Sequence, residues 1–315
     1  MKKILFLDSN HPDMIGALRA AGLECVENYQ DPEEKILSLI GEFDAVVIRS
    51  RFKLTKNFID AGKKLKCIAR AGAGMENIDV TYAQSKGIKC VHAPEGNRDA
   101  VGEHAIGMLL SLMNNLNRAD REVRDGKWRR EENRGHELQG KTVGIIGYGN
   151  MGSAFAQRLK GFDVKVIAYD KYKKNFGNDL VKEAQMEEVF TKSDVLSFHL
   201  PQTEETTYLL NEEYISRFKK PFWFINTARG KNVNTTALVN GIRSGKILGA
   251  CLDVLEYESV SFEDLDAKKL PEAFQFLIAS DKVILSPHIA GWTFESHRKI
   301  AKVLAEKIAE VFRQQ

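Results

Sequence analysis

The stretch KTVGIIGYGNMG at residues 141–152, followed by VKVIAYD at 164–170, is the strongest indication of the fold in this sequence. It combines an apolar strand, a glycine-rich turn, the start of a helix, a second apolar strand and an acidic residue at the end of that strand. This order is the dinucleotide-binding fingerprint in the context that it requires. Because the motif begins almost halfway along the chain, the first half must build a second structure.

The glycines and the acid of this motif have separate tasks. Gly147 permits the tight turn, Gly149 leaves room for a pyrophosphate against the backbone, and Gly152 lets the following helix pack closely on the strand. The N-terminus of that helix supplies free N–H groups for the phosphates. Asp170 would accept a hydrogen bond from the ribose 2′-OH of NAD and repel a 2′-phosphate, although the three lysines that follow weaken this preference. The motif therefore predicts NAD as the cofactor.

Size and charge narrow the class of protein. With 315 residues the chain is long enough for two domains. Lys plus Arg is 46 and Asp plus Glu is 43, so the net charge is only +3. This small excess argues against nucleic acid or a membrane surface as the main partner.

The spacing of the cysteines and the N-terminal sequence indicate in which cellular compartment the protein works. The four cysteines form no C-x-x-C pair, which favours free thiols in a reducing environment and no metal site. The start of the chain lacks a signal-peptide core, and no apolar run reaches the length of a membrane span. We therefore expect a cytoplasmic protein.

Short apolar runs alternate with helical patterns along most of the chain, which predicts parallel sheets with helical crossovers. The predicted strands are 3–8, 44–50, 66–72, 88–94, 142–147, 164–170, 194–200, 221–227, 247–254 and 282–288. The predicted helices outside the glycine motif are 11–21, 32–40, 55–61, 79–86, a long one at 98–126, and 293–312. The segment 259–281 is the least regular and is expected to form an excursion.

Four polar clusters follow predicted strands, at 199–203, 226–230, 252–258 and 286–292. In an open α/β sheet, ligands bind beyond the carboxyl ends of the strands, so these clusters are expected to face one crevice.

The motifs NTARG, DVLEYE and SPHIAG, in this order after GYGNMG, resemble those of the D-isomer-specific 2-hydroxyacid dehydrogenases. The segments at 70–79, 96–110 and 199–211 match as well, so the resemblance covers essentially the whole chain. The segment RAGAG at 70–74 and the turn at 95–97 look most like the D-3-phosphoglycerate dehydrogenase branch. Since the chain stops at 315, the resemblance implies the short form, without a regulatory domain.

The resemblance implies two Rossmann-like, doubly wound domains. The NAD-binding domain, 98–291, would be inserted in a flavodoxin-like substrate domain made of 1–97 and 292–315, with hinges near Asn97 and Gly291. The long helix after Asn97 resembles the family's dimer element, which implies a homodimer.

The resemblance also gives three residues catalytic roles that make chemical sense. His288 would be the acid/base, because imidazole is the side chain that ordinarily changes charge nearest neutrality. Glu258 would pair with the other ring nitrogen, favour the imidazolium form and hold the orientation of the ring. Arg229 would bind the substrate carboxylate and polarise the carbonyl. Taken singly, each could be an ordinary polar residue at a strand end or in a solvated loop. His104 and His136 are weaker candidates.

The remaining site residues follow from the motif and the resemblance together. The residues predicted to bind the cofactor are Gly147, Gly149, Asn150, Met151, Gly152, Asp170, His199, Pro201, Thr206, Thr227, Ala228, Asp253 and Gly291. Of these, Asp253 would contact the nicotinamide carboxamide, and His199 would act more through its backbone than its ring. The residues predicted to bind the substrate are Arg49, Ser50, Arg70, Ala73, Gly74 and Asn97.

The hypothesis of a phosphate-bearing substrate depends on Arg49 and Arg70. Both end predicted strands and match basic positions of phosphoglycerate dehydrogenases, and a phosphate-bearing substrate needs such charges. Arg51 could assist them. The alternative is that both arginines are structural or exposed, which would suit a smaller acid.

The favoured function is NAD-dependent oxidation of D-3-phosphoglycerate to 3-phosphohydroxypyruvate, or the reverse, in serine biosynthesis. A hydroxypyruvate or glyoxylate reductase is the alternative of the same class. An NAD(H)-sensing corepressor is the alternative of another class, since this fold also occurs there. Formate dehydrogenase is disfavoured because that branch pairs its histidine with Gln.

Ser259 departs from the proline that many members have after the catalytic Glu, which leaves the shape of that loop open.

Overall fold

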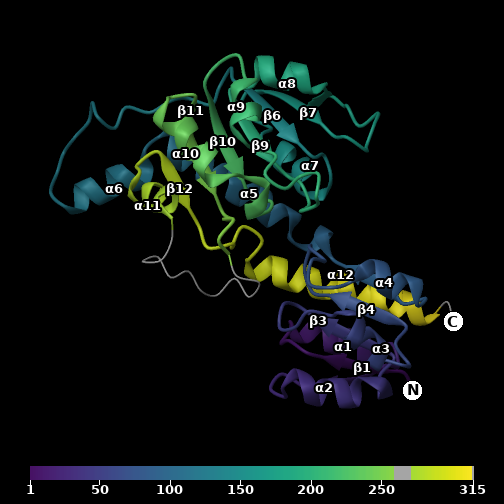
Figure 1. Ribbon diagram of the computed structural model, residues 1–315. Coiled ribbons are helices and arrows are strands. Elements are labelled where there is room, and N and C mark those ends of the chain that lie inside the picture. The colour runs from purple at the N-terminus through teal and green to yellow at the C-terminus, as the bar shows by residue number, and fades with distance from the viewer. Residues whose placement is uncertain (259–270, 314–315) are drawn as a thin grey trace. The chain divides into compact units, whose positions relative to one another are not determined.

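The computed structural model describes residues 1–258 and 271–313. Expectations about Ser259 and the first part of the segment 259–281 therefore lie outside the described residues. The expectation of irregular structure was wrong for the second part, where 272–279 forms a helix that buries Phe274 and Leu277. The chain divides into two compact units, one formed by Met1–Arg98 with Trp292–Gln315 and the other by Asp99–Gly291. Both chain ends belong to the first unit (Figure 1). No helix among the described residues is long and apolar enough to cross a membrane.

The first unit contains a five-stranded parallel sheet. Across the sheet its strands are β2 (Glu24–Glu27), β1 (Lys3–Phe6), β3 (Ala45–Ile48), β4 (Cys67–Arg70) and β5 (Lys89–His92). This 2-1-3-4-5 order is the flavodoxin-like order of doubly wound sheets. Strand β2 was not predicted, because the edge strand ECVE buries only Cys25 and has no apolar run.

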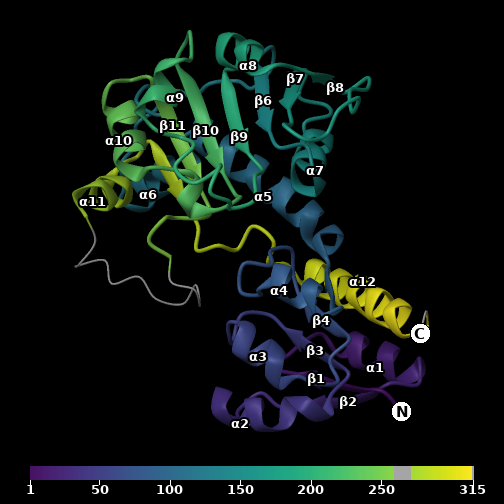
Figure 2. The ribbon, with the colours of Figure 1, turned by 45° about the vertical axis from the view of Figure 1, so that its right-hand side comes forward.

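Helices cover both faces of this sheet. They are α1 (Pro12–Ala20), α2 (Glu33–Leu39) with the 3-10 turn η1 (Ile40–Glu42), α3 (Lys56–Ala61), α4 (Val80–Ser85) and α12 (Phe294–Arg313). Figure 2 shows α1 and α12 on one side of the sheet, where Leu18 and Leu304 enter one core, and α2 and α3 on the other, where Ile36 and Phe58 enter a second core. The strands are buried from both sides, as parallel strands normally are.

The second unit contains a seven-stranded parallel sheet. Across the sheet its strands are β12 (Val283–Leu285), β11 (Ile247–Leu252), β10 (Phe222–Asn226), β9 (Val195–Phe198), β6 (Thr142–Ile146), β7 (Lys165–Tyr169) and β8 (Val181–Glu183). Counted from β6, this is the dinucleotide-binding order, with the switch between β6 and β9. The predicted α/β fold of two doubly wound parallel sheets is confirmed. The short edge strand β8 was not predicted.

The helices of the second unit also form two layers. They are α5 (Pro94–Met113), which begins in the first unit, α6 (Leu116–Arg124), α7 (Asn150–Arg158), α8 (Met186–Lys192), α9 (Glu212–Ser216), the turn η2 (Gly230–Asn232), α10 (Thr235–Arg243) and α11 (Glu272–Ala279). Leu109 of α5 and Phe155 of α7 enter one core. Phe190 of α8 and Leu238 of α10 enter the core on the opposite face.

The prediction of one long helix at 98–126 was wrong in two respects. The helix begins earlier, at Pro94, which suits the first turn because proline has no N–H to leave unsatisfied. It is also broken at Asn115, which adopts a left-handed backbone with φ of 53° before α6 starts. Asparagine tolerates this conformation better than most residues do, so the Asn-Asn pair can end one helix and open the next.

Candidate active site

Three candidate catalytic residues lie in loops at one edge of the second sheet. Arg229 follows β10, Glu258 follows β11 and His288 follows β12. These strands are neighbours and parallel, so their carboxyl ends meet at the same edge. The fold thus brings together three residues that are far apart in the sequence.

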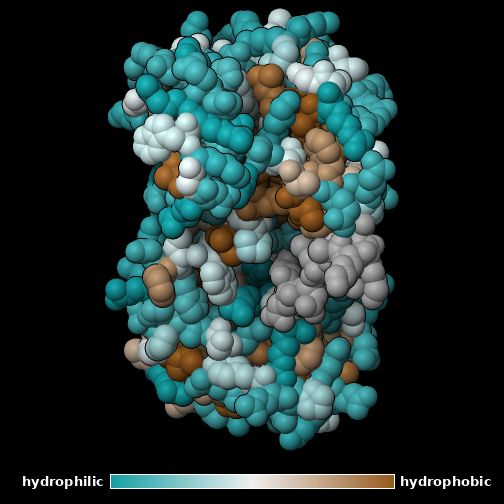
Figure 3. All heavy atoms as spheres, turned by 90° about the vertical axis from the view of Figure 1, so that its left-hand side faces the viewer, coloured by the Kyte–Doolittle hydropathy of each residue, from teal (hydrophilic) through white to brown (hydrophobic). Residues whose placement is uncertain are grey.

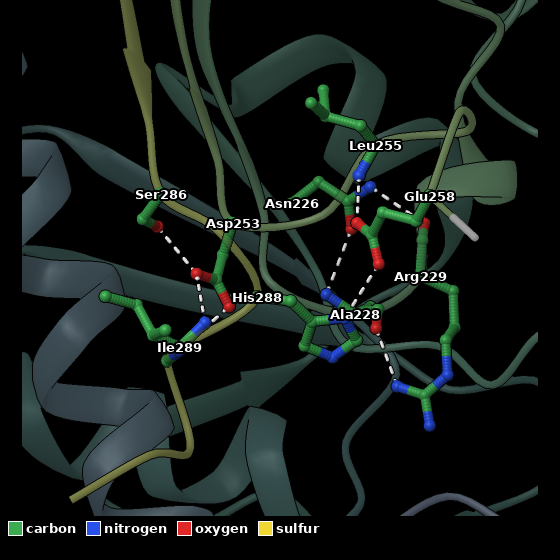
Figure 4. Close-up of polar contacts among 10 residues, drawn as sticks. Asn226, Ala228, Arg229, Asp253, Leu255, Glu258, Ser286, His288 and Ile289 are labelled. Carbon is green, nitrogen blue, oxygen red and sulfur yellow. Dashed lines mark hydrogen bonds and ion pairs between the residues drawn. The ribbon is translucent and has the colours of Figure 1, made fainter. Parts of the chain in front are cut away.

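His288 and Glu258 form an ion pair. Glu258 Oε2 lies 2.8 Å from His288 Nδ1, and the two side chains are 16% and 28% exposed. The other carboxylate oxygen of Glu258 accepts a hydrogen bond from the N–H of Leu255, and this bond fixes the orientation of the carboxylate. Figure 4 shows the carboxylate pointing at the imidazole ring. A histidine held in this way has a defined tautomer and ring orientation.

The backbone of His288 is unusual. Its φ is 56°, in the left-handed region that residues other than glycine rarely adopt. Such a conformation costs roughly 1–3 kcal/mol and persists only where the surroundings impose it, often at functional sites. The carbonyl of Asp253 accepts from the His288 N–H at 2.8 Å, which ties this turn to the end of β11.

Asn226 shapes the loop that carries Arg229. This buried side chain donates to the Arg229 carbonyl at 2.9 Å and accepts from the Ala228 N–H at 3.1 Å. The Arg229 guanidinium donates to the Ala228 carbonyl at 2.7 Å. The arginine therefore leaves the strand in a closed turn rather than on an open surface loop.

Gly230 packs the Arg229 loop against the segment that leads to Glu258. A Cβ at this position would lie 2.0 Å from the Leu255 carbonyl oxygen and 2.6 Å from the Glu256 nitrogen. Only glycine allows this approach, so Gly230 sets how near the two loops can come.

The glycines of the fingerprint differ in what surrounds them. A Cβ on Gly147, whose φ is 90°, would lie 2.4 Å from the His199 carbonyl oxygen, and one on Gly152 would lie 2.0 Å from the Gly147 carbonyl oxygen. A Cβ on Gly149 would meet nothing within 4 Å. Gly149 is the N-cap of α7, whose first residues are Asn150 and Met151. Gly147 and Gly152 are thus required by the close packing of the protein's own backbone, whereas Gly149 faces open space.

Asp170 lies beside this loop, just after β7. Burial by itself raises the pKa of its carboxyl group, but hydrogen bonds from the N–H groups of Lys173, Tyr148 and Tyr172 outweigh it and lower the pKa below its usual value. The carboxylate is therefore anionic at neutral pH. Lys171 pairs with Glu205, so this lysine has a carboxylate of its own and does not neutralise Asp170.

The other predicted cofactor residues lie on loops of the same unit. The Thr227 hydroxyl is buried and has no hydrogen-bond partner among the described residues. Thr206 Oγ1 donates to the Pro201 carbonyl at 2.7 Å, which closes the loop after β9. Ala228 is buried beside Thr227, and Gly291 is the last residue of this unit.

His199 is enclosed by protein. Its Nε2 lies 2.9 Å from Ser197 Oγ, and its Nδ1 is buried without a partner among the described residues. Burial lowers the pKa of this imidazole to about 3, so the ring is neutral at physiological pH. It is therefore no candidate for an acid or base.

The enclosed His199 should make the fold acid-sensitive. Between pH 6.5, the ordinary pKa, and about 3, the unfolded chain binds a proton that the folded chain does not, so stability falls as the pH is lowered. We expect urea titrations to show a shallower loss of unfolding free energy over this range for His199→Gln than for wild type. The exposed ring in His136→Gln is the control, and equal slopes for all three proteins would disprove the effect.

The predicted substrate residues Arg49 and Ser50 lie in the first unit, after β3. Their N–H groups donate to the Asp8 carboxylate at 2.6 and 3.3 Å. The half-buried Arg49 guanidinium lies over the Trp292 ring, 5.0 Å from its centroid, and has no carboxylate partner among the described residues. The Arg51 guanidinium, suggested as an assisting group, donates to three backbone carbonyls and joins loops of this unit.

Arg70 and the glycine loop after β4 pack on each other. The Arg70 guanidinium occupies the space that a Cβ on Gly72 would fill, at 1.6 Å from Nη1. His92 Nδ1 lies 2.5 Å from the Ala73 carbonyl oxygen and holds the loop that continues into Gly74. Asn97, by contrast, lies within helix α5, where its Oδ1 is buried without a partner among the described residues.

Comparison with known proteins identifies the second unit. The family model described as D-isomer specific 2-hydroxyacid dehydrogenase, NAD binding domain, matches residues 106–290. The chain belongs to this dehydrogenase family. The dehydrogenase is therefore an NAD-dependent oxidoreductase, as the sequence predicted.

Curated relatives and solved structures agree with this family. The dehydrogenase is 38% identical over 287 residues to a hydroxypyruvate reductase of Thermotoga maritima, covering 91% of this chain and 90% of that one. It is 34% identical over 311 residues to a D-3-phosphoglycerate dehydrogenase of Archaeoglobus fulgidus, covering 98% of this chain but only 57% of the relative. A D-lactate dehydrogenase of Aquifex aeolicus, solved with NAD and lactic acid, has a TM-score of 0.81 at 30% identity, covering 99% and 96% of the two chains.

The residues of the dehydrogenase fit NAD. The open space at Gly149 lies where a pyrophosphate needs close access to the backbone at a helix N-terminus. The anionic Asp170 suits the two ribose hydroxyls of NAD and disfavours a 2′-phosphate. Gly149 and Asp170 therefore present the features that suit NAD at this end of the sheet.

The fingerprint glycines allow a direct test of this assignment. We expect Gly149→Ala to keep the melting temperature, because its Cβ meets no protein atom, but to weaken NADH binding by filling the phosphate space. Gly152→Ala is expected to lower the melting temperature, because its Cβ would clash with the Gly147 carbonyl. Fluorescence titration with NADH and thermal unfolding measure the two effects, and a destabilised Gly149→Ala protein would contradict the assignment.

Sequence reasoning missed the residues that support the site. Asn226, Gly230 and Ser286 contact the loops of the three catalytic candidates, yet none belongs to a residue type that signals acid/base chemistry. Their positions next to strand ends were the only available signal, and many loop residues share it.

Proposed function

We propose that the dehydrogenase interconverts D-3-phosphoglycerate and 3-phosphohydroxypyruvate with NAD, the reaction that feeds serine biosynthesis. The observation that carries this proposal is the half-buried Arg49 guanidinium, which has no carboxylate partner among the described residues. A partly desolvated cation without a counter-charge is unfavourable unless a ligand provides the charge. The phosphate of the substrate would do so.

In this proposal the first unit is the substrate domain. The N–H groups of Ala73 and Gly74 would bind the substrate carboxylate, as successive amides in glycine loops can. His92 would keep that loop in place through the Ala73 carbonyl. Arg70, packed on Gly72, would support the loop and add positive charge.

The three residues of the second unit would perform the proton chemistry. Bound NAD supplies the acceptor or donor of the hydride. Because Glu258 engages Nδ1, proton transfer to the carbonyl oxygen, or from the hydroxyl, falls to Nε2 of His288. The Glu258 carboxylate would stabilise the imidazolium form during that transfer. Arg229 would hold the carboxylate next to the reacting carbon and polarise the carbonyl.

A hydroxypyruvate reductase is the second candidate function. It is favoured by the T. maritima relative, which bears that name and matches over most of its own length. The smaller substrate lacks the phosphate, so under this alternative Arg49 would not discriminate between acids.

Arg49→Gln separates these two functions. We expect the KM for 3-phosphohydroxypyruvate to rise roughly ten- to a hundredfold, the range for a lost hydrogen bond to a charged group, while the KM for hydroxypyruvate changes little. Steady-state rates of NADH oxidation with both acids provide the measurement. Arg19→Gln, an exposed arginine of the same unit, is the matched control. Equal changes of KM for the two acids would show that Arg49 does not bind the phosphate.

We also propose a homodimer in a reducing compartment such as the cytoplasm. Large apolar side chains are exposed around α6 and α11, at Leu116, Val123, Trp128 and Ile278. Figure 3 shows brown, apolar atoms exposed among hydrophilic ones on one face of the molecule. Exposed patches of this kind often mark protein interfaces. The four free thiols support the compartment. Light scattering would test the dimer, and a monomeric mass would disprove it.

A further inference from the structure

The left-handed turn at His288 is held by one buried carboxylate. Asp253 is 1% exposed, and its Oδ1 and Oδ2 accept from the N–H groups of Ile289 and Ala290, each at 2.9 Å. Its carbonyl accepts from the N–H of His288 itself. Figure 4 shows the Asp253 carboxylate between the Ser286 hydroxyl and the Ile289 nitrogen. Asp253 thus contacts the backbone of three consecutive residues, with the acid/base candidate as the first of them.

Two further side chains complete the environment of Asp253. Ser286 Oγ lies 2.6 Å from Asp253 Oδ1, and His104 Nε2 lies 2.9 Å from Ser286 Oγ. An ionised carboxylate can only accept, so the serine hydroxyl donates to Asp253. Its single proton is then used, and His104 must donate from Nε2 to the serine oxygen. The chain therefore runs from His104 to Ser286 to Asp253.

This direction excludes a nucleophilic serine. A serine nucleophile gives its proton to a histidine that a carboxylate orients. Here the serine lies between the other two groups and donates to the carboxylate, while the histidine donates to the serine. The cluster can orient Asp253, but it cannot activate Ser286.

We infer that His104 and Ser286 are positioning residues for the acid/base step, acting through Asp253 on the turn of His288. This inference rests on the proposed role of His288. His104 and Ser286 fix the rotation of the Asp253 carboxylate, and the carboxylate fixes the backbone from which the imidazole reaches Glu258. Loss of the Ser286 hydroxyl would leave the two backbone N–H groups as the donors that hold the Asp253 carboxylate, and loss of His104 would leave the hydroxyl without the donor that orients it. Either change is expected to loosen the left-handed turn of His288.

The test compares two pairs of variants with wild type. Ser286→Ala and His104→Leu remove the donors, whereas Ser286→Thr and His104→Gln keep them. We expect the first pair to lower kcat roughly ten- to a hundredfold, the range for a hydrogen bond to a charged group. The affinity for NADH should stay unchanged, and the pH profile of kcat/KM should shift. The second pair should recover most of the rate. Ser216→Ala, which removes an exposed hydroxyl of the same unit, should leave all parameters unchanged.

Two outcomes would overturn the inference. One is a wild-type kcat and pH profile in both donor-less variants, with a lower melting temperature as the only change, which would show a purely structural role. The other is a loss of NADH affinity that accounts for the whole loss of kcat/KM, which would make the cluster a cofactor contact. If His288→Ala also turned over normally, the proposed function itself would have failed, and the two failures are thereby distinguished.

Discussion

His288→Ala is expected to abolish turnover while NADH still binds. A positioned general acid/base contributes roughly 10²–10⁴-fold to a rate, and the ion pair with Glu258 indicates that this histidine is held for such a task. His288 follows β12, and three strands separate β12 from β6 and its glycine loop, so the loss of the ring should leave the phosphate site intact. Stopped-flow rates with a 2-oxo acid and fluorescence titration with NADH provide the two measurements.

Glu258→Gln is the matched control for this prediction. It keeps a hydrogen-bond acceptor for His288 Nδ1 but removes the negative charge, so an intermediate loss of rate is expected. If His288→Ala lost NADH binding as completely as turnover, the histidine would be structural and the acid/base assignment would be wrong.

Arg229→Gln is expected to lower kcat/KM for every 2-oxo acid by roughly 10²–10³-fold, the range for one preorganised donor at a reacting carbonyl. The guanidinium is the one group in this proposal that contacts both the carboxylate and the carbonyl, so a neutral amide should impair binding and rate together. Arg229→Lys keeps the charge but not the planar fork, and only partial recovery is expected.

Arg217→Gln is the control for Arg229. Arg217 belongs to the same unit but pairs with Glu187 on the surface, so its loss should not affect the kinetics. A wild-type kcat/KM for Arg229→Gln would show that another group binds the substrate carboxylate.

Much of the fold could be predicted because its determinants are local. The alternation of apolar strands and helices is visible in short windows, and the glycines of the fingerprint stand in a fixed order. Strands β2 and β8 were not predicted, because edge strands such as ECVE and VKE bury too few residues to give an apolar run. The break at Asn115 was not predicted, because a single left-handed residue does not change the helical periodicity of the apolar residues around it.

The catalytic candidates could be named because parallel strands deliver their loops to one edge of the sheet. The supporting contacts could not, since they depend on packing between distant segments. Arg51 illustrates this, because its charge suggested substrate binding until its three carbonyl partners were visible. Asp253 was expected at the nicotinamide, and the structure adds hydrogen bonds to the His288 turn that no sequence pattern encodes.

We propose that this chain transfers hydride between NAD and a 2-oxo or 2-hydroxy acid, and that His288 moves the proton. The most direct measurement is NADH oxidation by the wild-type protein with a panel of 2-oxo acids that includes 3-phosphohydroxypyruvate, hydroxypyruvate and glyoxylate. We expect turnover with the highest kcat/KM for 3-phosphohydroxypyruvate. NADH binding without oxidation by any acid of the panel would contradict it and would favour an NAD(H)-sensing protein instead.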